Sequence, residues 1–160
     1  MTSNDPAAAA DLERSSERWI AWLAAETAGR RHPPASVLDA LWDALEEWFA
    51  SDDFAGSALA EAVVAPPDGR GPAAHAALVR HREATRRLLE DLAGVAGARD
   101  PAALAGQLLT LVEGAIAGAL IDRHPTAARH ARELTQLALT AAVPHGQGRV
   151  DRSAHYRSKS

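Results

Sequence analysis

Four histidines are the first candidates for chemistry in this sequence, because imidazole is the commonest protein ligand of metal ions. They form two pairs, His75 with His81 and His124 with His130. Histidines that share a metal on a helix normally stand four residues apart, whereas each pair here is six apart and falls on nearly opposite faces. We therefore expect no metal site. His81, which stands between two arginines, is expected at a pocket edge or on the surface.

Catalytic chemistry has equally little support. The chain has no cysteine, no glycine-rich phosphate loop and no G-x-S-x-G turn. Seven acidic residues lie within residues 35–66 without a lysine or arginine, and their spacing is more typical of a solvated helix face than of a cation site. Four arginines between residues 80 and 87 are expected to pair with Glu83 and Glu90 along one helix. We expect neither an enzyme nor a cofactor.

Aromatic side chains provide the candidates for binding. Six of the seven aromatic residues fall within the first 54 positions, where they could line a cavity for a small hydrophobic molecule or simply fill the core. Gln107, an uncharged amide among leucines, could orient such a ligand or form a bond across a dimer. The candidate ligand-binding residues are Trp19, Trp22, Trp42, Phe49, Phe54, Leu78, Thr85, Gln107, Leu108 and Leu111.

The elements that must position these side chains are helices. The 160 residues include 38 alanines and only seven Trp, Tyr or Phe residues, so the best helix former dominates and sheet-forming residues are scarce. The sequence marks five helix starts. Four are the pairs Asp5-Pro6, Gly71-Pro72, Asp100-Pro101 and His124-Pro125, and the fifth is Ser36. We expect an all-α domain over residues 6–143, with six helices at about 6–28, 36–50, 56–64, 72–95, 101–122 and 125–143.

The two ends of the chain and its most apolar segment indicate where in the cell the protein is expected. Residues 1–5 and the polar, basic residues 144–160 are expected to be disordered. The N-terminal residues do not resemble a signal peptide, which favours a cytoplasmic protein. Residues 101–121 are apolar but contain Gln107, Glu113 and three glycines, so we expect a buried helix and no membrane span.

The last two expected helices carry small residues on adjoining faces, which favours close packing against a second copy of the chain. We therefore expect a homodimer in which these helices and their symmetry mates form a four-helix bundle. The expected interface residues are Gly114, Gly118, Ile121, Ala127, Ala128, Ala131, Leu134 and Ala138.

Several landmarks resemble one known family. They are the step Phe54-Ala55-Gly56-Ser57, the turn and helix start from Ala96 to Leu108, and the step from Val112 to Ala115. With the helix order over residues 10–142, they make the chain similar to the C-terminal regulatory domain of TetR-family transcriptional regulators. The resemblance implies a six-helix domain that dimerises, binds a small apolar or amphipathic molecule and responds by a shift in the placement of its two subunits.

The resemblance does not extend to the DNA-binding head of that family. A helix-turn-helix precedes the regulatory domain in those regulators, whereas here the helix that would follow the head begins almost at Met1. The part expected to fold also has no basic face. We expect no specific DNA binding by this chain alone, so that regulation would need a head from elsewhere. The alternative is an interaction protein that forms mixed dimers with full-length regulators.

Overall fold

A computed structural model describes residues 5–30, 37–67 and 69–144 of the chain. In these ranges the protein is all-α, with seven helices and no strand, which confirms the expected fold class. The residues expected to form a disordered tail lie outside the described part except for Pro144, and so do Met1–Asn4. The helices are α1 (Asp5–Arg30), α2 (Val37–Phe49), α3 (Asp52–Ala55), α4 (Ala58–Val64), α5 (Pro72–Val95), α6 (Pro101–Asp122) and α7 (Thr126–Ala142).

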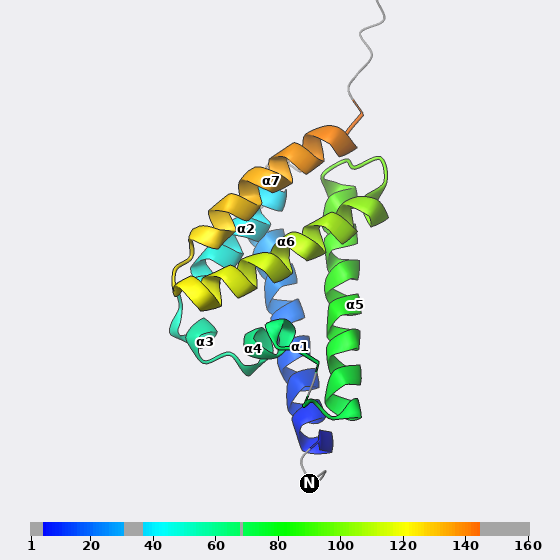
Figure 1. Cartoon of the computed structure of the whole chain (residues 1–160). Helices are drawn as coiled ribbons and strands as arrows, with labels where there is room; N and C mark the ends of the chain where they lie inside the picture. Colours follow the sequence, from blue (N-terminus) through cyan, green and yellow to red (C-terminus); the bar gives the residue numbers. More distant parts are fainter. Residues whose placement is uncertain (1–4, 31–36, 68, 145–160) are drawn as a thin grey trace, which may run out of the picture.

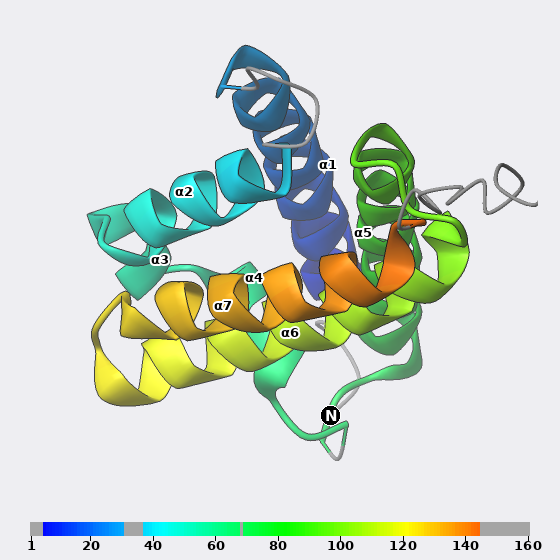
Figure 2. The same ribbon diagram turned by 90° about the horizontal axis from the view of Figure 1, so that it is seen from above.

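The long helices form two packed pairs. α1 and α5 run side by side along most of their length, and α6 and α7 form an antiparallel pair that crosses them (Figure 1). Seen from above, α2 lies against α1 and α7, while the short helix α4 contacts α6 (Figure 2). One apolar core therefore lies where the two pairs cross, and its largest fully buried side chain is Trp42.

Helix α3 is not among the helices that the sequence predicts, because it lies between the expected helices at about 36–50 and 56–64. The Ser51 hydroxyl accepts a hydrogen bond from the Phe54 N–H, and the side chains of Asp52 and Asp53 stand in the first turn, where the helix dipole favours negative charge. The same residues thus end α2 and begin a short new helix, and the six expected helices become seven.

The expected helix starts at Gly71-Pro72 and Asp100-Pro101 are confirmed. Pro72 and Pro101 occupy the first turns of α5 and α6, and the Asp100 carboxylate caps α6 by accepting a hydrogen bond from the Ala103 N–H at 3.0 Å. Pro125 differs, because it precedes α7 as the capping residue and Thr126 is the first helical residue. Ser36 lies outside the described residues.

The start of α5 has an unusual cap. Gly71 has no side chain that could cap the helix, and the carboxylate of Asp5 takes that role from the first turn of α1. It accepts hydrogen bonds from the N–H groups of Ala73 and Ala74 at 2.9 and 3.0 Å. A Cβ atom at position 71 would lie 2.2 Å from the Asp5 carboxyl carbon, so only glycine leaves room for this cap.

Helix α6 is the most apolar element. By length and composition it could cross a membrane, with a mean hydropathy of 1.7 over 18 residues. In the fold 44% of that window is buried, against α4, α5 and α7. The inward face of α6 is therefore covered by other helices of the chain.

Candidate functional site

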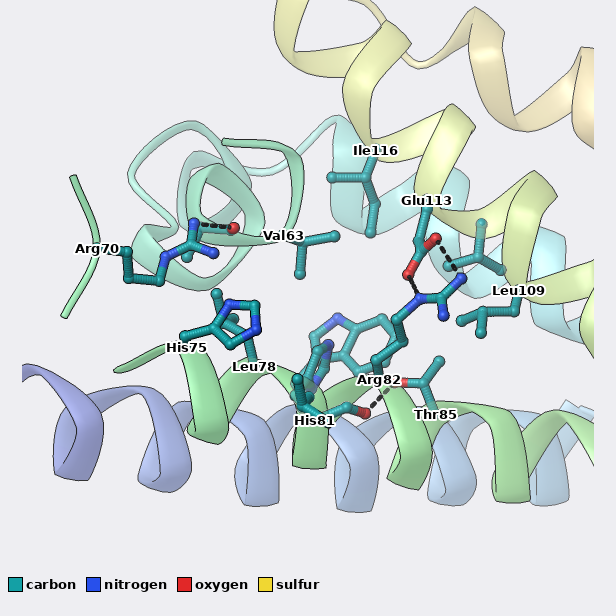
Figure 3. Close-up of a pocket in the computed structure, with 14 residues that line it drawn as sticks. Val63, Arg70, His75, Leu78, His81, Arg82, Thr85, Leu109, Glu113 and Ile116 are labelled. Atoms are coloured by element: carbon teal, nitrogen blue, oxygen red, sulfur yellow. Dashed lines mark hydrogen bonds and ion pairs between the residues drawn. The ribbon is translucent and has the colours of Figure 1, made fainter. Parts of the chain in front are cut away.

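A cavity of about 140 Å³ lies between α4, α5 and α6 (Figure 3). Apolar side chains such as Val63, Leu78 and Ile116 surround it, and α1 contributes Trp19. The volume is close to that of cavities that hold a single benzene ring and is below the roughly 300 Å³ of a typical drug-sized pocket. The lining residues are Trp19, Ala62, Val63, Arg70, His75, Leu78, Val79, His81, Arg82, Thr85, Leu109, Val112, Glu113 and Ile116.

An ion pair joins α5 to α6 beside this cavity. The Arg82 Nε donates to Glu113 Oε1 at 2.7 Å, and this hydrogen bond raises the pKa of Arg82 above its usual value (Figure 3). Arg70 also borders the cavity, and its Nη2 donates to the backbone carbonyl of Ala62 at 2.7 Å. Both guanidinium groups are therefore held by partners within the chain.

The most buried titratable group of the cavity is His81, which is 7% exposed. Its Nδ1 shares a hydrogen bond of 2.8 Å with the Ser16 hydroxyl of α1. Burial lowers the pKa of His81 to about 4, against a smaller opposing effect of the Glu113 carboxylate. The ring is therefore neutral at pH 7.

The Ser16 and His81 pair has the residue types of a nucleophile and its base. Ser16 is 9% exposed and is not part of the cavity wall, so its hydroxyl does not face a space that a substrate could enter. The pair joins α1 to α5 as a buried hydrogen bond. Sequence reasoning missed this contact, although His81 stands on the apolar stripe of α5, three residues after Leu78 and four before Thr85.

The structure brings together only part of the expected ligand-binding set. Trp19, Leu78 and Thr85 line the cavity, and Thr85 Oγ1 donates to the carbonyl oxygen of His81 at 2.9 Å. His81, which we expect at a pocket edge or on the surface, is one of the residues that line the cavity. The sequence did not indicate Arg82 and Glu113, because its expected partners for the arginines were all on α5.

Of the five aromatic residues expected to line a cavity, only Trp19 lines this one. Phe49 and Phe54 pack directly on each other, with ring centroids 4.9 Å apart, and Trp22 lies against Trp48 at 6.2 Å. Trp42 is 1% exposed and belongs to the core between α2 and α7. These side chains interdigitate, so they leave the cavity wall to α4, α5, α6 and Trp19.

Two further members of the set lie on the opposite side of α6. Gln107 and Leu111 line a groove of about 640 Å³ between α6 and α7, whereas Leu108 is fully buried in the core. The other groove residues are Arg99, Asp100, Ala103, Leu104, Thr110, Leu134, Ala138, Ala141 and Ala142.

This groove belongs to a wider surface, which we call the α6–α7 face. It consists of most of the groove residues together with three others on the same two helices. These residues are Ala103, Leu104, Gln107, Thr110, Leu111, Gly114, Ile121, Leu134, Leu137, Ala138, Ala141 and Ala142. Arg99 and Asp100 border the groove at one end, and none of the residues of the α6–α7 face itself is charged. Ile121 and Leu137 are 80% and 69% exposed, more than any other large hydrophobic residue among those described. An apolar stripe with this exposure is typical of an interaction surface.

The expected interface residues divide between this face and the inside of the chain. Gly114, Ile121, Leu134 and Ala138 lie on the α6–α7 face. Ala128 and Ala131 are 1% and 5% exposed, because α7 turns them toward the core of its own chain. A Cβ atom at Gly118 would lie 3.1 Å from Ala127 Cβ, so the small residues at these two positions serve the packing of α6 on α7.

Surface charges follow the expected pattern in part. Arg86 and Arg87 pair with Glu83, and Arg86 also pairs with Glu90, along α5. Arg80 pairs instead with Glu13 of α1, and Arg82 with Glu113 of α6. Within residues 5–30, 37–67 and 69–144, no three His, Asp or Glu side chains gather as they would around a metal ion.

Comparison with known proteins gives no match for this chain among protein-family models, curated proteins or solved structures.

Proposed function

We propose that this chain is a regulatory domain of the TetR type, which dimerises through the α6–α7 face and binds a small apolar or amphipathic molecule in the cavity. The observation that carries the proposal is the position of α6. One side of this helix supplies Leu109, Val112 and Ile116 to the cavity, and the other supplies Gln107, Leu111 and Gly114 to the α6–α7 face.

The α6–α7 face favours a second copy of the chain as its partner. A two-fold axis brings the same surface of both copies together, so a mostly uncharged face meets another mostly uncharged face. Two antiparallel helices from each copy would form a four-helix bundle, the arrangement that the resemblance to TetR-family domains implies. The apolar residues Ile121, Leu134 and Leu137 would then be covered.

The shared helix gives the proposed domain a route from ligand to subunit placement. A molecule that fits the cavity better in one position of α6 favours that position, and α6 carries the dimer surface with it. If a DNA-binding element is joined to or paired with this domain, the change in subunit placement would alter the spacing of two such elements.

Substitution of Gly114 by arginine tests the proposed dimer. No atom lies within 4 Å of the position that a Cβ would take at Gly114, so Gly114→Arg fits the fold of the single chain. In the dimer it would bring unpaired charges into the apolar interface. Gly29→Arg on α1 is the matched control, since position 29 is equally open.

Light scattering after size exclusion should give a dimer for the wild type and Gly29→Arg, and a folded monomer for Gly114→Arg. A monomeric wild type, or a Gly114→Arg variant that remains dimeric, would contradict the proposed dimer through this face.

A further inference from the structure

One residue of the cavity wall carries a buried hydrogen-bond donor that no described residue accepts from. Trp19 is 8% exposed and lines the cavity, and its indole Nε1 is buried without a hydrogen-bond partner among the described residues. Buried indole N–H groups normally find an acceptor, because an unpaired donor loses its bond to water and gains nothing in return. Among the described residues no group supplies this acceptor.

A second polar group lies beside this donor. The imidazole of His81 meets the indole of Trp19 edge to face, with ring centroids 5.5 Å apart. Its Nδ1 is already paired with Ser16 at 2.8 Å, which leaves Nε2 for another partner. A neutral imidazole bonded at one nitrogen offers a single donor or acceptor at the other. Two neighbouring residues of the cavity wall thus carry uncharged groups that can form hydrogen bonds.

The remaining wall limits the size and the charge of a ligand. Leu78, Val112 and Ile116 supply apolar surface, and the volume of about 140 Å³ suits a single six-membered ring with a small substituent. The Arg82 and Glu113 side chains, which pair at 2.7 Å beside the cavity, neutralise each other. A carboxylate ligand would lie near Glu113 and would have to compete with it for Arg82.

We infer that the cavity binds a small neutral aromatic molecule with one hydroxyl or carbonyl oxygen, which accepts a hydrogen bond from Trp19 Nε1. His81 Nε2 forms the second hydrogen bond to the same substituent, and the ring lies against the apolar wall. This inference rests on the proposed function only in that it names the ligand class of the same cavity.

Phenol, benzene and benzoate are the probes that test the inference, with titration calorimetry and the indole N–H signals of the four tryptophans in the NMR spectrum as readouts. Trp19→Phe removes the donor and keeps an aromatic ring. We expect this variant to bind phenol about tenfold more weakly, which corresponds to about 1.4 kcal/mol, and to bind benzene as the wild type does.

Trp22→Phe is the matched control, because Trp22 lies three residues away on α1, packs against Trp48 and is not part of the cavity wall. It should leave the affinity of both probes unchanged. The Trp19 indole signal of the wild type, assigned from its loss in Trp19→Phe, should shift with phenol and far less with benzene. The wild-type shift remains a test if Trp19→Phe folds poorly.

Equal affinity of Trp19→Phe and wild type for phenol would overturn the inference, as would tighter binding of benzoate than of phenol or no binding of phenol at all. These outcomes are distinct from a failure of the proposed dimer, since the mass of the chain in solution is measured without any probe.

Discussion

Trp42 and Thr135 are 93 residues apart in the sequence, yet the indole Nε1 of Trp42 donates a hydrogen bond of 2.8 Å to the Thr135 Oγ1. Both side chains are fully buried, and the bond joins α2 to α7. The Thr135 hydroxyl donates in turn to the carbonyl of Ala131 at 2.8 Å. This pair fixes the position of α7, and with it the orientation of the α6–α7 face.

Replacement of Thr135 by valine tests the importance of this bond. The two side chains have similar shapes, but valine leaves the buried Trp42 N–H without an acceptor. We expect Thr135→Val to lower the free energy of unfolding by about 2 kcal/mol in urea denaturation. Thr140→Val is the control, because the exposed Thr140 hydroxyl makes the same kind of bond to a helix carbonyl and has no tryptophan partner. Equal losses in the two variants would contradict this role of Thr135.

The cap of α5 by Asp5 gives a second prediction. Asp5→Ala removes the acceptor for two N–H groups at the start of α5 and should lower the free energy of unfolding by about 1 kcal/mol. Asp11→Ala is the control, since Asp11 on the same helix only pairs with the exposed Arg14. Thermal unfolding followed by circular dichroism would show the difference, and an Asp5→Ala variant as stable as Asp11→Ala would contradict the cap.

The buried His81 predicts a loss of stability in weak acid. Its pKa is about 4 in the fold and about 6.5 in the unfolded chain, so between these values the unfolded chain binds more protons. The free energy of unfolding therefore falls as the pH drops from about 6.5 to 4, by about 3 kcal/mol from this group. The groups that act on the ring are Ser16 and Trp19 of α1, which contact it, and the Glu113 carboxylate of α6, which opposes the fall in its pKa.

Denaturation of His81→Gln between pH 7 and 5 measures this contribution. We expect the variant to lose less stability than the wild type over this range, where carboxylates have little effect. His130→Gln, at an exposed position of α7, should keep the wild-type dependence. Identical pH dependence in His81→Gln and the wild type would show that His81 does not carry the effect.

Local signals in the sequence predicted much of the fold. The pairs Gly71-Pro72 and Asp100-Pro101 mark the starts of α5 and α6 because proline suits the first turn of a helix whatever the rest of the chain does. Helical spacing likewise identified Leu78 and Thr85 as inward-facing. Such signals depend on neighbouring residues only, so they can be read without knowledge of the tertiary structure.

The site was less accessible to prediction, because spacing indicates which residues turn inward and not what they meet. Trp42 and Phe54 are buried as their spacing suggests, but they meet Thr135 and Phe49, and neither lines the cavity. Ala131 of α7 faces the core of its own chain because α7 packs on α2 as well as on α6. The contact of Ser16 with His81 spans 65 residues and has no signal in the local sequence.

In the proposed function, α6 links the cavity to the dimer surface. Sedimentation equilibrium of the wild type, with and without saturating phenol, measures this linkage directly as a change in the dissociation constant of the dimer. We predict dimers without phenol and a change of about fivefold or more when it is bound, the lower end of measured coupling between sites. A chain that stays at its monomer mass of 16.9 kDa at all concentrations, or a dissociation constant that bound phenol leaves unchanged, would contradict the account.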